Sequence, residues 1–302
     1  MSIESGFIPY HATSILGNGP VLVLAPHPDD EVFGCAGTIM RHVAAGDPVK
    51  VVILTDGGGA VAEGSARAAC IAQRQDESRA AAAILGYGQP EFWEYRDREL
   101  HCDEALTQRL LAVVAAVGAR WLYAPSPAEI HPDHHALSLA ALSVGQRLGA
   151  AIHLAFYEIG VPLPPNRLLD ISDLWERKRQ AIACFTSQLA DQAYDRHVEA
   201  LNCYRSYTLA GNVQAAEAYR VMVGSATQWE MWPARPTLTE LNPDAAVRQQ
   251  LEQCQHHIQA LQAELEQRQA DYDRIAASRS WRLTGPLRAV ARWLRAWRTT
   301  AA

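Results

Sequence analysis

The sequence lacks long apolar runs and has few cysteines for its length. No stretch approaches the ~18 uninterrupted apolar residues that a membrane span needs, and its start, 1-MSIESGFIPYHATS-14, has neither the basic nor the apolar region of a secretory signal peptide. The six cysteines among 302 residues are scattered without a C-x-x-C spacing, which argues against a disulfide framework or a cysteine zinc site. We therefore expect a cytoplasmic protein with reduced thiols.

Acidic residues are missing from the C-terminal end of the chain. Residues 276–302 contain six arginines and no acid, whereas the whole chain has a net charge of −6. The preceding part therefore carries −12, and such an acidic body disfavours nucleic acid as a partner.

Short apolar, β-branched runs alternate with longer segments of helical period. This pattern is typical of βαβ units on a parallel sheet and predicts a Rossmann-like, doubly wound, mostly parallel α/β sheet. The expected strands are 21–25, 49–55, 91–95, 120–124 and 151–158. The expected helices lie near 35–45, 65–85, 103–117 and 134–148.

The pattern then changes along the chain. A Pro-rich connection covers 160–170, and helices are expected from 172 to 189 and again around 213–223. Prolines within 232–243 indicate the end of a globular domain of residues 1–235.

Charged and glycine-rich loops follow three of the expected strands. They are 26-PHPDDE-31, 55-TDGGGA-60 and 125-PSPAEIHPDHH-135. In open α/β sheets ligands bind outside the carboxyl ends of the strands, so we expect these loops to converge on one edge.

The crowding of His27, Asp29, Asp30 and Glu31 suggests a bound cation, because close carboxylates repel each other. A catalytic zinc takes about three nitrogen or oxygen ligands and keeps one position open. The loop 27-HPDDE-31 offers a histidine and aspartates, and 131-HPDHH-135 offers a third ligand. Alone, each segment would read as a capped turn; together, on one sheet edge, they favour a metal site.

These segments resemble the LmbE-like, or PIG-L, family of zinc-dependent N-deacetylases over roughly residues 18–225. The resemblance is carried by 26-PHPDDE-31, 131-HPDH-134 and 74-RQDESRAAAAILG-86, with weaker similarity in 178-KRQAIACFTSQ-188 and 217-EAYRV-221. It implies that His27, Asp30 and His134 ligate one zinc ion per chain, although iron can occupy similar His/Asp sets.

The resemblance also implies roles for the other polar residues. Asp29 would be the general base, and His131 would stabilise or protonate the reacting amide. We expect the Asp133 carboxylate to keep His131 protonated. Arg74 and Asp97 would contact the hydroxyls of a sugar, and a surface salt bridge is an equally good account of that pair. Glu31 is expected to cap the following helix or to orient His27.

A different pattern begins after the globular domain. Apolar positions alternate at spacings of four and three through 244–276, which predicts a coiled coil and hence a homo-oligomer. The positions are Val247, Leu251, Cys254, Ile258, Leu261, Leu265, Arg268, Tyr272 and Ile275. A single amphipathic helix folded back on the domain is the alternative.

The segment 279–302 is a basic amphipathic helix by its pattern, with tryptophans on the apolar side. We expect it to lie on the inner face of the cytoplasmic membrane; packing on a partner chain is the alternative. The stretch 280-SWRLTGPLR-288 resembles tails of bacterial glycosyltransferases of surface-polysaccharide assembly.

The sequence thus predicts an enzyme that removes the N-acetyl group of an amino sugar, in a lipid- or nucleotide-linked precursor of cell-surface polysaccharide. Two alternatives remain open. The tetrapeptide 133-DHHA-136 is also found in metal-dependent phosphoesterases, and the chain could serve as a zinc-bearing scaffold in polysaccharide assembly.

Overall fold

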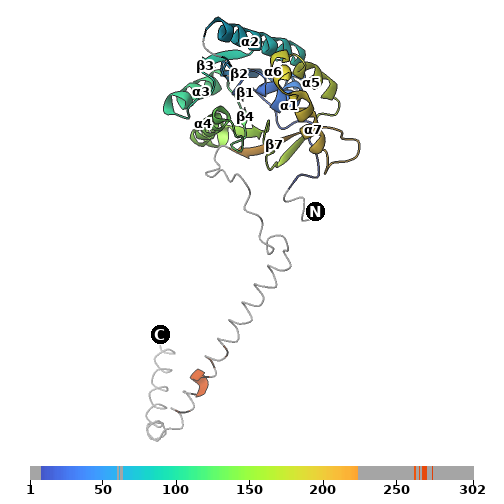
Figure 1. Cartoon of the computed structure of the whole chain (residues 1–302). Helices are drawn as coiled ribbons and strands as arrows, with labels where there is room; N and C mark the ends of the chain where they lie inside the picture. Colours follow the sequence, from blue (N-terminus) through green and yellow to red (C-terminus); the bar gives the residue numbers. More distant parts are fainter. Residues whose placement is uncertain are drawn as a thin grey trace. The chain divides into compact units, whose positions relative to one another are not determined.

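The computed structural model describes residues 8–59, 61, 64–223, 262, 265, 267–270 and 274 (Figure 1). The chain divides into two units, Met1–Arg235 and Pro236–Ala302, and the α/β fold belongs to the first. In the second, the described residues are helical and exposed. The rest of the 244–276 segment and the whole of 279–302 lie outside the described residues, so the coiled coil, the oligomer and the membrane contact stay predictions. Among the helices that are described, none is long and apolar enough to cross a membrane.

A seven-stranded sheet forms the centre of the first unit, in the order β3-β2-β1-β4-β5-β7-β6. The strands are β1 Val21–Ala25, β2 Val49–Thr55, β3 Glu91–Tyr95, β4 Trp121–Pro125, β5 His153–Tyr157, β6 Arg167–Asp170 and β7 Ala216–Val223. Strands β1 to β5 are parallel, whereas β7 runs antiparallel to both β5 and β6. The predicted mostly parallel α/β sheet is confirmed.

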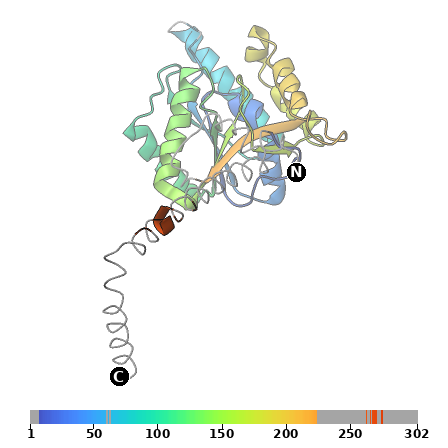
Figure 2. The same ribbon diagram turned by 90° about the horizontal axis from the view of Figure 1, so that it is seen from below.

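Helices cover both faces of the sheet (Figures 1 and 2). They are α1 Asp30–Ala45, α2 Ser65–Leu85, α3 Glu104–Val117, α4 Pro132–Leu148, α5 Trp175–Ile182, α6 Thr186–Asp191 and α7 Tyr194–Tyr204. Helices α1, α2 and α5 pack together, as do α3 and α4. Because side chains alternate along a strand, Val21 and Val23 of β1 join the core on the α1 side, and Leu22 and Leu24 join the core on the α4 side.

The C-terminal part of the domain differs from its prediction. The helix expected around 213–223 is wrong, because Ala216–Val223 forms strand β7. Ala216 and Ala218 face one core and Tyr219 faces another, so the strand is apolar on both sides and hides its period of two. The Pro-rich connection contains β6, the 172–189 helix is broken into α5 and α6, and α7 was not foreseen.

The strand order places the ends of β1 and β4 side by side at the sheet centre. Strand β2 lies on one side of β1 and β4 on the other, so the order of connection reverses between β1 and β4. At such a point the loops leave toward opposite faces, and ligands bind between them. Residues 26–30 and 126–132, which follow these strands, are thereby brought together from distant parts of the chain.

Candidate functional site

The loop between β1 and α1 holds its acidic residues in a strained backbone. Asp29 has φ of 137°, in a region that side chains other than glycine rarely adopt. It occupies the N-cap position of α1, yet its side chain makes no capping hydrogen bond. Its backbone N–H donates to Glu31 Oε2 at 3.1 Å. The Asp29 carboxylate is therefore not used as a helix cap, and Glu31 supports the turn rather than His27.

Three ligand atoms from two loops form a nearly equilateral triangle. His27 Nδ1 lies 3.1 Å from Asp30 Oδ2 and 3.1 Å from His134 Nε2. The third side, His134 Nε2 to Asp30 Oδ2, measures 3.2 Å. Bonds of about 2.0–2.1 Å to a tetrahedral zinc place its ligands about 3.3–3.4 Å apart. This His/Asp group could therefore bind a metal ion with little movement of the side chains.

The charges at this triangle compensate one another. Burial disfavours the charged form of His27, but hydrogen bonds to Asp133 and Asp30 raise its pKa well above the ordinary value. Burial likewise works against an ionised Asp30, yet the adjacent His134 and His27 lower the pKa of Asp30 strongly. A divalent cation would supply the same positive charge and let both imidazoles act as neutral ligands.

The second nitrogen of His27 faces a different pair of carboxylates. His27 Nε2 lies 3.1 Å from Asp133 Oδ2 and 3.4 Å from Asp97 Oδ1. The Asp133 carboxylate also accepts hydrogen bonds from the backbone N–H groups of Arg98 and Leu100. A carboxylate on the free nitrogen of a ligating histidine fixes its tautomer and orientation. Asp133 is therefore placed to orient His27.

The expected pairing of Asp133 with His131 is not what the structure shows. His131 Nδ1 is 4.0 Å from Asp133 Oδ2 and instead accepts the backbone N–H of Asp133 at 3.3 Å, as the N-cap of α4. Burial, and then the positive charges of His27 and His134, lower the pKa of His131. His131 is thus neutral near pH 7 in the metal-free protein, because the backbone of the 98–100 loop draws Asp133 away from it.

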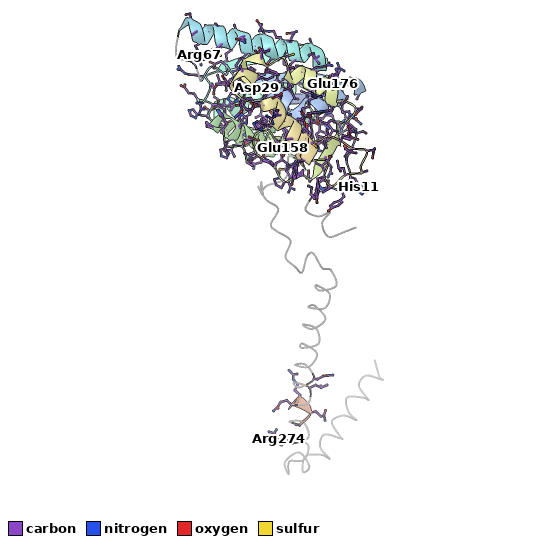
Figure 3. All side chains as sticks on the ribbon, turned by 45° about the vertical axis from the view of Figure 1, so that its right-hand side comes forward. His11, Asp29, Arg67, Glu158, Glu176 and Arg274 are labelled. Atoms are coloured by element: carbon purple, nitrogen blue, oxygen red, sulfur yellow. The ribbon has the colours of Figure 1, made fainter. Side chains whose placement is uncertain are left out.

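Arg74 of α2 is buried beneath the β1–α1 loop. Its guanidinium donates to Asp29 Oδ2 at 2.9 Å, to the carbonyl of Pro28 at 2.9 Å and to that of Gly57 at 2.7 Å. A Cβ on Gly57, whose φ is 65°, would lie 2.5 Å from Arg74 Nη1, so this turn requires glycine. Burial raises the pKa of Asp29 to about 7, and the charge of Arg74 opposes that rise. Expected at a sugar hydroxyl, Arg74 is directed at Asp29, whose place in the fold is labelled in Figure 3.

Asp97 presents a buried oxygen without a hydrogen-bond partner among the described residues. Its Oδ2 accepts the N–H of Gly59 at 3.0 Å, while Oδ1 makes no hydrogen bond. That Oδ1 lies 3.9 Å from His131 Nε2. Asp97 is therefore free to accept a hydrogen bond from a bound molecule. The three predicted loops do converge, and they bring together all eight predicted site residues.

One buried acid in the site loops escaped the sequence reasoning. Glu129 stands in the quoted loop 125-PSPAEIHPDHH-135, and its carboxylate approaches His134 Nδ1 to 3.8 Å. Its only sequence signal was its position in that loop.

Comparison with known proteins places this site in a class. A family model described as "PIG-L: GlcNAc-PI de-N-acetylase" matches residues 22–144, a range that includes every site residue named above. The chain carries a PIG-L domain of the LmbE-like type.

Three relatives illustrate the range of proteins with this domain. Diacetylchitobiose deacetylase of Thermococcus kodakarensis is 28% identical and aligns over 58% of this chain and 72% of its own. The solved N,N'-diacetylchitobiose deacetylase of Pyrococcus horikoshii has a TM-score of 0.60 at 25% identity, over 68% of this chain and 84% of its own. A 4-oxalmesaconate hydratase of Pseudomonas putida is 26% identical over 55% of this chain and 73% of its own.

Proposed function

We propose that this protein is a metal-dependent amidohydrolase that removes the N-acetyl group from an N-acetylated amino sugar. The observation that carries the proposal is the ligand triangle of His27, Asp30 and His134 beside the buried Asp29 carboxylate. Both deacetylases named above, which share this domain, support it.

We assign the metal site to His27, Asp30 and His134, with Zn²⁺ as the expected ion. When bound, zinc supplies a Lewis acid for the amide carbonyl and makes water more acidic. The donor set of two imidazoles and one carboxylate suits zinc, and iron can use similar ligands.

Asp29 is the proposed general base. With a pKa near 7 it is balanced between the two protonation states at neutral pH, which favours proton transfer in either direction. It accepts the proton of the attacking water and can pass it to the leaving amine. Arg74 holds the carboxylate in place for both transfers.

His131 and Asp97 form the proposed substrate side of the site. His131 is less buried than the metal ligands, with its side chain 26% exposed, and is placed to hydrogen-bond the reacting carbonyl. The unpartnered Oδ1 of Asp97 is a ready acceptor for a sugar hydroxyl. We keep the lipid- or nucleotide-linked precursor of a surface polysaccharide as the proposed substrate and the cytoplasm as the place of reaction. Oligomer formation through 244–276 and membrane contact through 279–302 belong to the same proposal.

The hydratase relative makes addition of water to a carbon–carbon double bond the second candidate. Both reactions need an activated water, but only deacetylation releases an amine and acetate. The test is therefore to incubate the zinc-loaded protein with N-acetylated monosaccharides, nucleotide sugars and lipid-linked sugars and to assay both products. An unsaturated dicarboxylate serves as the hydratase substrate. Free amine and acetate in equal amounts support the proposal. Loss of the double bond without amine release from any sugar overturns it.

A further inference from the structure

The ring of His134 has an unusual hydrogen-bonding state on the side away from the ligand triangle. Its Nε2 faces Asp30 and His27, whereas its Nδ1 is buried and has no hydrogen-bond partner among the described residues. A neutral histidine that offers Nε2 to a metal carries its proton on Nδ1. That buried N–H then requires an acceptor.

The nearest carboxylate is that of Glu129. Glu129 Oε2 lies 3.8 Å from His134 Nδ1, and its side chain is 3% exposed. Two hydrogen bonds of about 2.8 Å through a water would span about 4.6 Å, so the gap is too short for a bridging water. A shift of less than about 1 Å would make a direct hydrogen bond.

Glu129 is itself held by the loop after β5. Its carboxylate accepts hydrogen bonds from the backbone N–H groups of Ile159, Gly160 and Val161 at 2.8–3.2 Å. A Cβ on Gly160 would lie 3.3 Å from Oε2, the same oxygen that faces His134. The loop thus fixes where this oxygen points.

From these contacts we propose that Glu129 is a positioning residue. It accepts the Nδ1–H of His134, fixes the tautomer that presents Nε2 to the metal, and anchors this ligand to the loop 159–161. This inference rests on the proposed metal site, where a carboxylate partner typically changes metal affinity 10–100-fold.

Glu129→Gln tests the assignment. The amide can still accept from the loop through one oxygen, but its NH₂ group can face His134 Nδ1 and favour the tautomer with the proton on Nε2, which cannot ligate. Glu158→Gln is the matched control. Glu158, labelled in Figure 3, is also buried and also binds the start of this connection, through the N–H of Leu163, but its hydrogen bonds go to Leu163 and Arg205.

The measurements are zinc affinity, by competition with a chromophoric chelator, and the visible spectrum of the Co²⁺-loaded protein. We expect Glu129→Gln to weaken zinc binding 10–100-fold and to change the Co²⁺ spectrum, while Glu158→Gln stays within about 3-fold of the wild type. Gly160→Ala keeps the carboxylate but crowds Oε2, and it should weaken zinc binding by less than Glu129→Gln does.

Three results would overturn parts of the argument separately. If the wild type binds no metal at this site, the proposed function fails. If the wild type binds zinc and Glu129→Gln matches it in affinity and spectrum, the role of Glu129 fails. If Glu129→Gln and Glu158→Gln weaken binding equally, the loop matters and the contact with His134 does not. Should Glu129→Gln not fold, as judged by circular dichroism, Gly160→Ala decides by the same two measurements.

Discussion

Arg74 Nη2 donates a hydrogen bond of 2.9 Å to Asp29 Oδ2, across 45 residues of sequence and between two side chains that are each about a tenth exposed. The same guanidinium binds the carbonyls of Pro28 and Gly57, so it connects the loops after β1 and β2. Arg74 therefore fixes both the position and the charge of the proposed base.

Replacing Arg74 separates its two candidate roles. If it positions Asp29, Arg74→Met lowers kcat by about 10²-fold or more and leaves KM within a few-fold. Arg74→Lys recovers only part of kcat, because an ammonium cannot reproduce the planar fork that reaches three acceptors. Steady-state kinetics on the substrate found in the panel assay provides the measurement. A raised KM with unchanged kcat would instead show that Arg74 binds the sugar.

Asp29 and Asp30 are neighbours with different predicted functions. Asp29→Asn should retain the metal and lose about 10²–10⁴-fold in kcat, since a general base is removed. Asp30→Asn should lose the metal, because it removes one corner of the ligand triangle. Metal analysis of both purified variants, together with activity, checks this pair. Equal metal loss in both would contradict the division of roles.

Glu31 predicts a pH-dependent difference in stability. Burial, and then the charge of Asp29, raise the pKa of Glu31 from its ordinary 4.5 to about 8. Between these values the unfolded chain has released the proton and the folded protein has kept it, so the stability that Glu31 contributes falls as pH rises. Glu31→Gln has no such loss, and its free energy of unfolding should gain on the wild type by up to about 1.4 kcal/mol per pH unit.

Urea unfolding of the metal-free proteins at pH 4.5, 6 and 7.5 measures this difference. Chelator is kept in all samples, because a bound cation would change the charges around Glu31. A difference between Glu31→Gln and the wild type that does not change with pH would show that the folded protein ionises Glu31 normally.

The buried ion pair of Lys178 and Glu217 should matter for stability and not for catalysis. Lys178 Nζ donates to Glu217 at 2.8 Å and to the carbonyl of Phe33 at 3.0 Å, and both side chains are fully buried. Lys178→Met leaves Glu217 charged and buried without its cation, which typically costs about 3–5 kcal/mol. The double variant Lys178→Met/Glu217→Gln should recover part of that loss, as measured by thermal unfolding. Activity per folded molecule is expected to stay near the wild type.

Much of the fold and of the site was predictable because its signals are local. The strands β1 to β5 are short apolar runs, and four of the helices end at glycines that suit a helix end. Strand β7 was missed because it is apolar on both faces, and α7 because its pattern of helical period was not recognised. The helix α1 begins at Asp30, earlier than expected, because the metal loop and the first helical turn share residues.

The sequence by itself determined which chemical groups are present and in which loops they lie. The HPDDE and HPDHH segments, each placed after a strand, were enough to predict a metal site at one sheet edge. Only the tertiary structure decided which atom faces which. It turned Asp133 from His131 to His27, Arg74 from the sugar to Asp29, and Glu129 toward His134. These partners lie in different loops, and their contacts depend on the order of the strands and on the backbone N–H groups that each carboxylate meets there, neither of which a local pattern encodes.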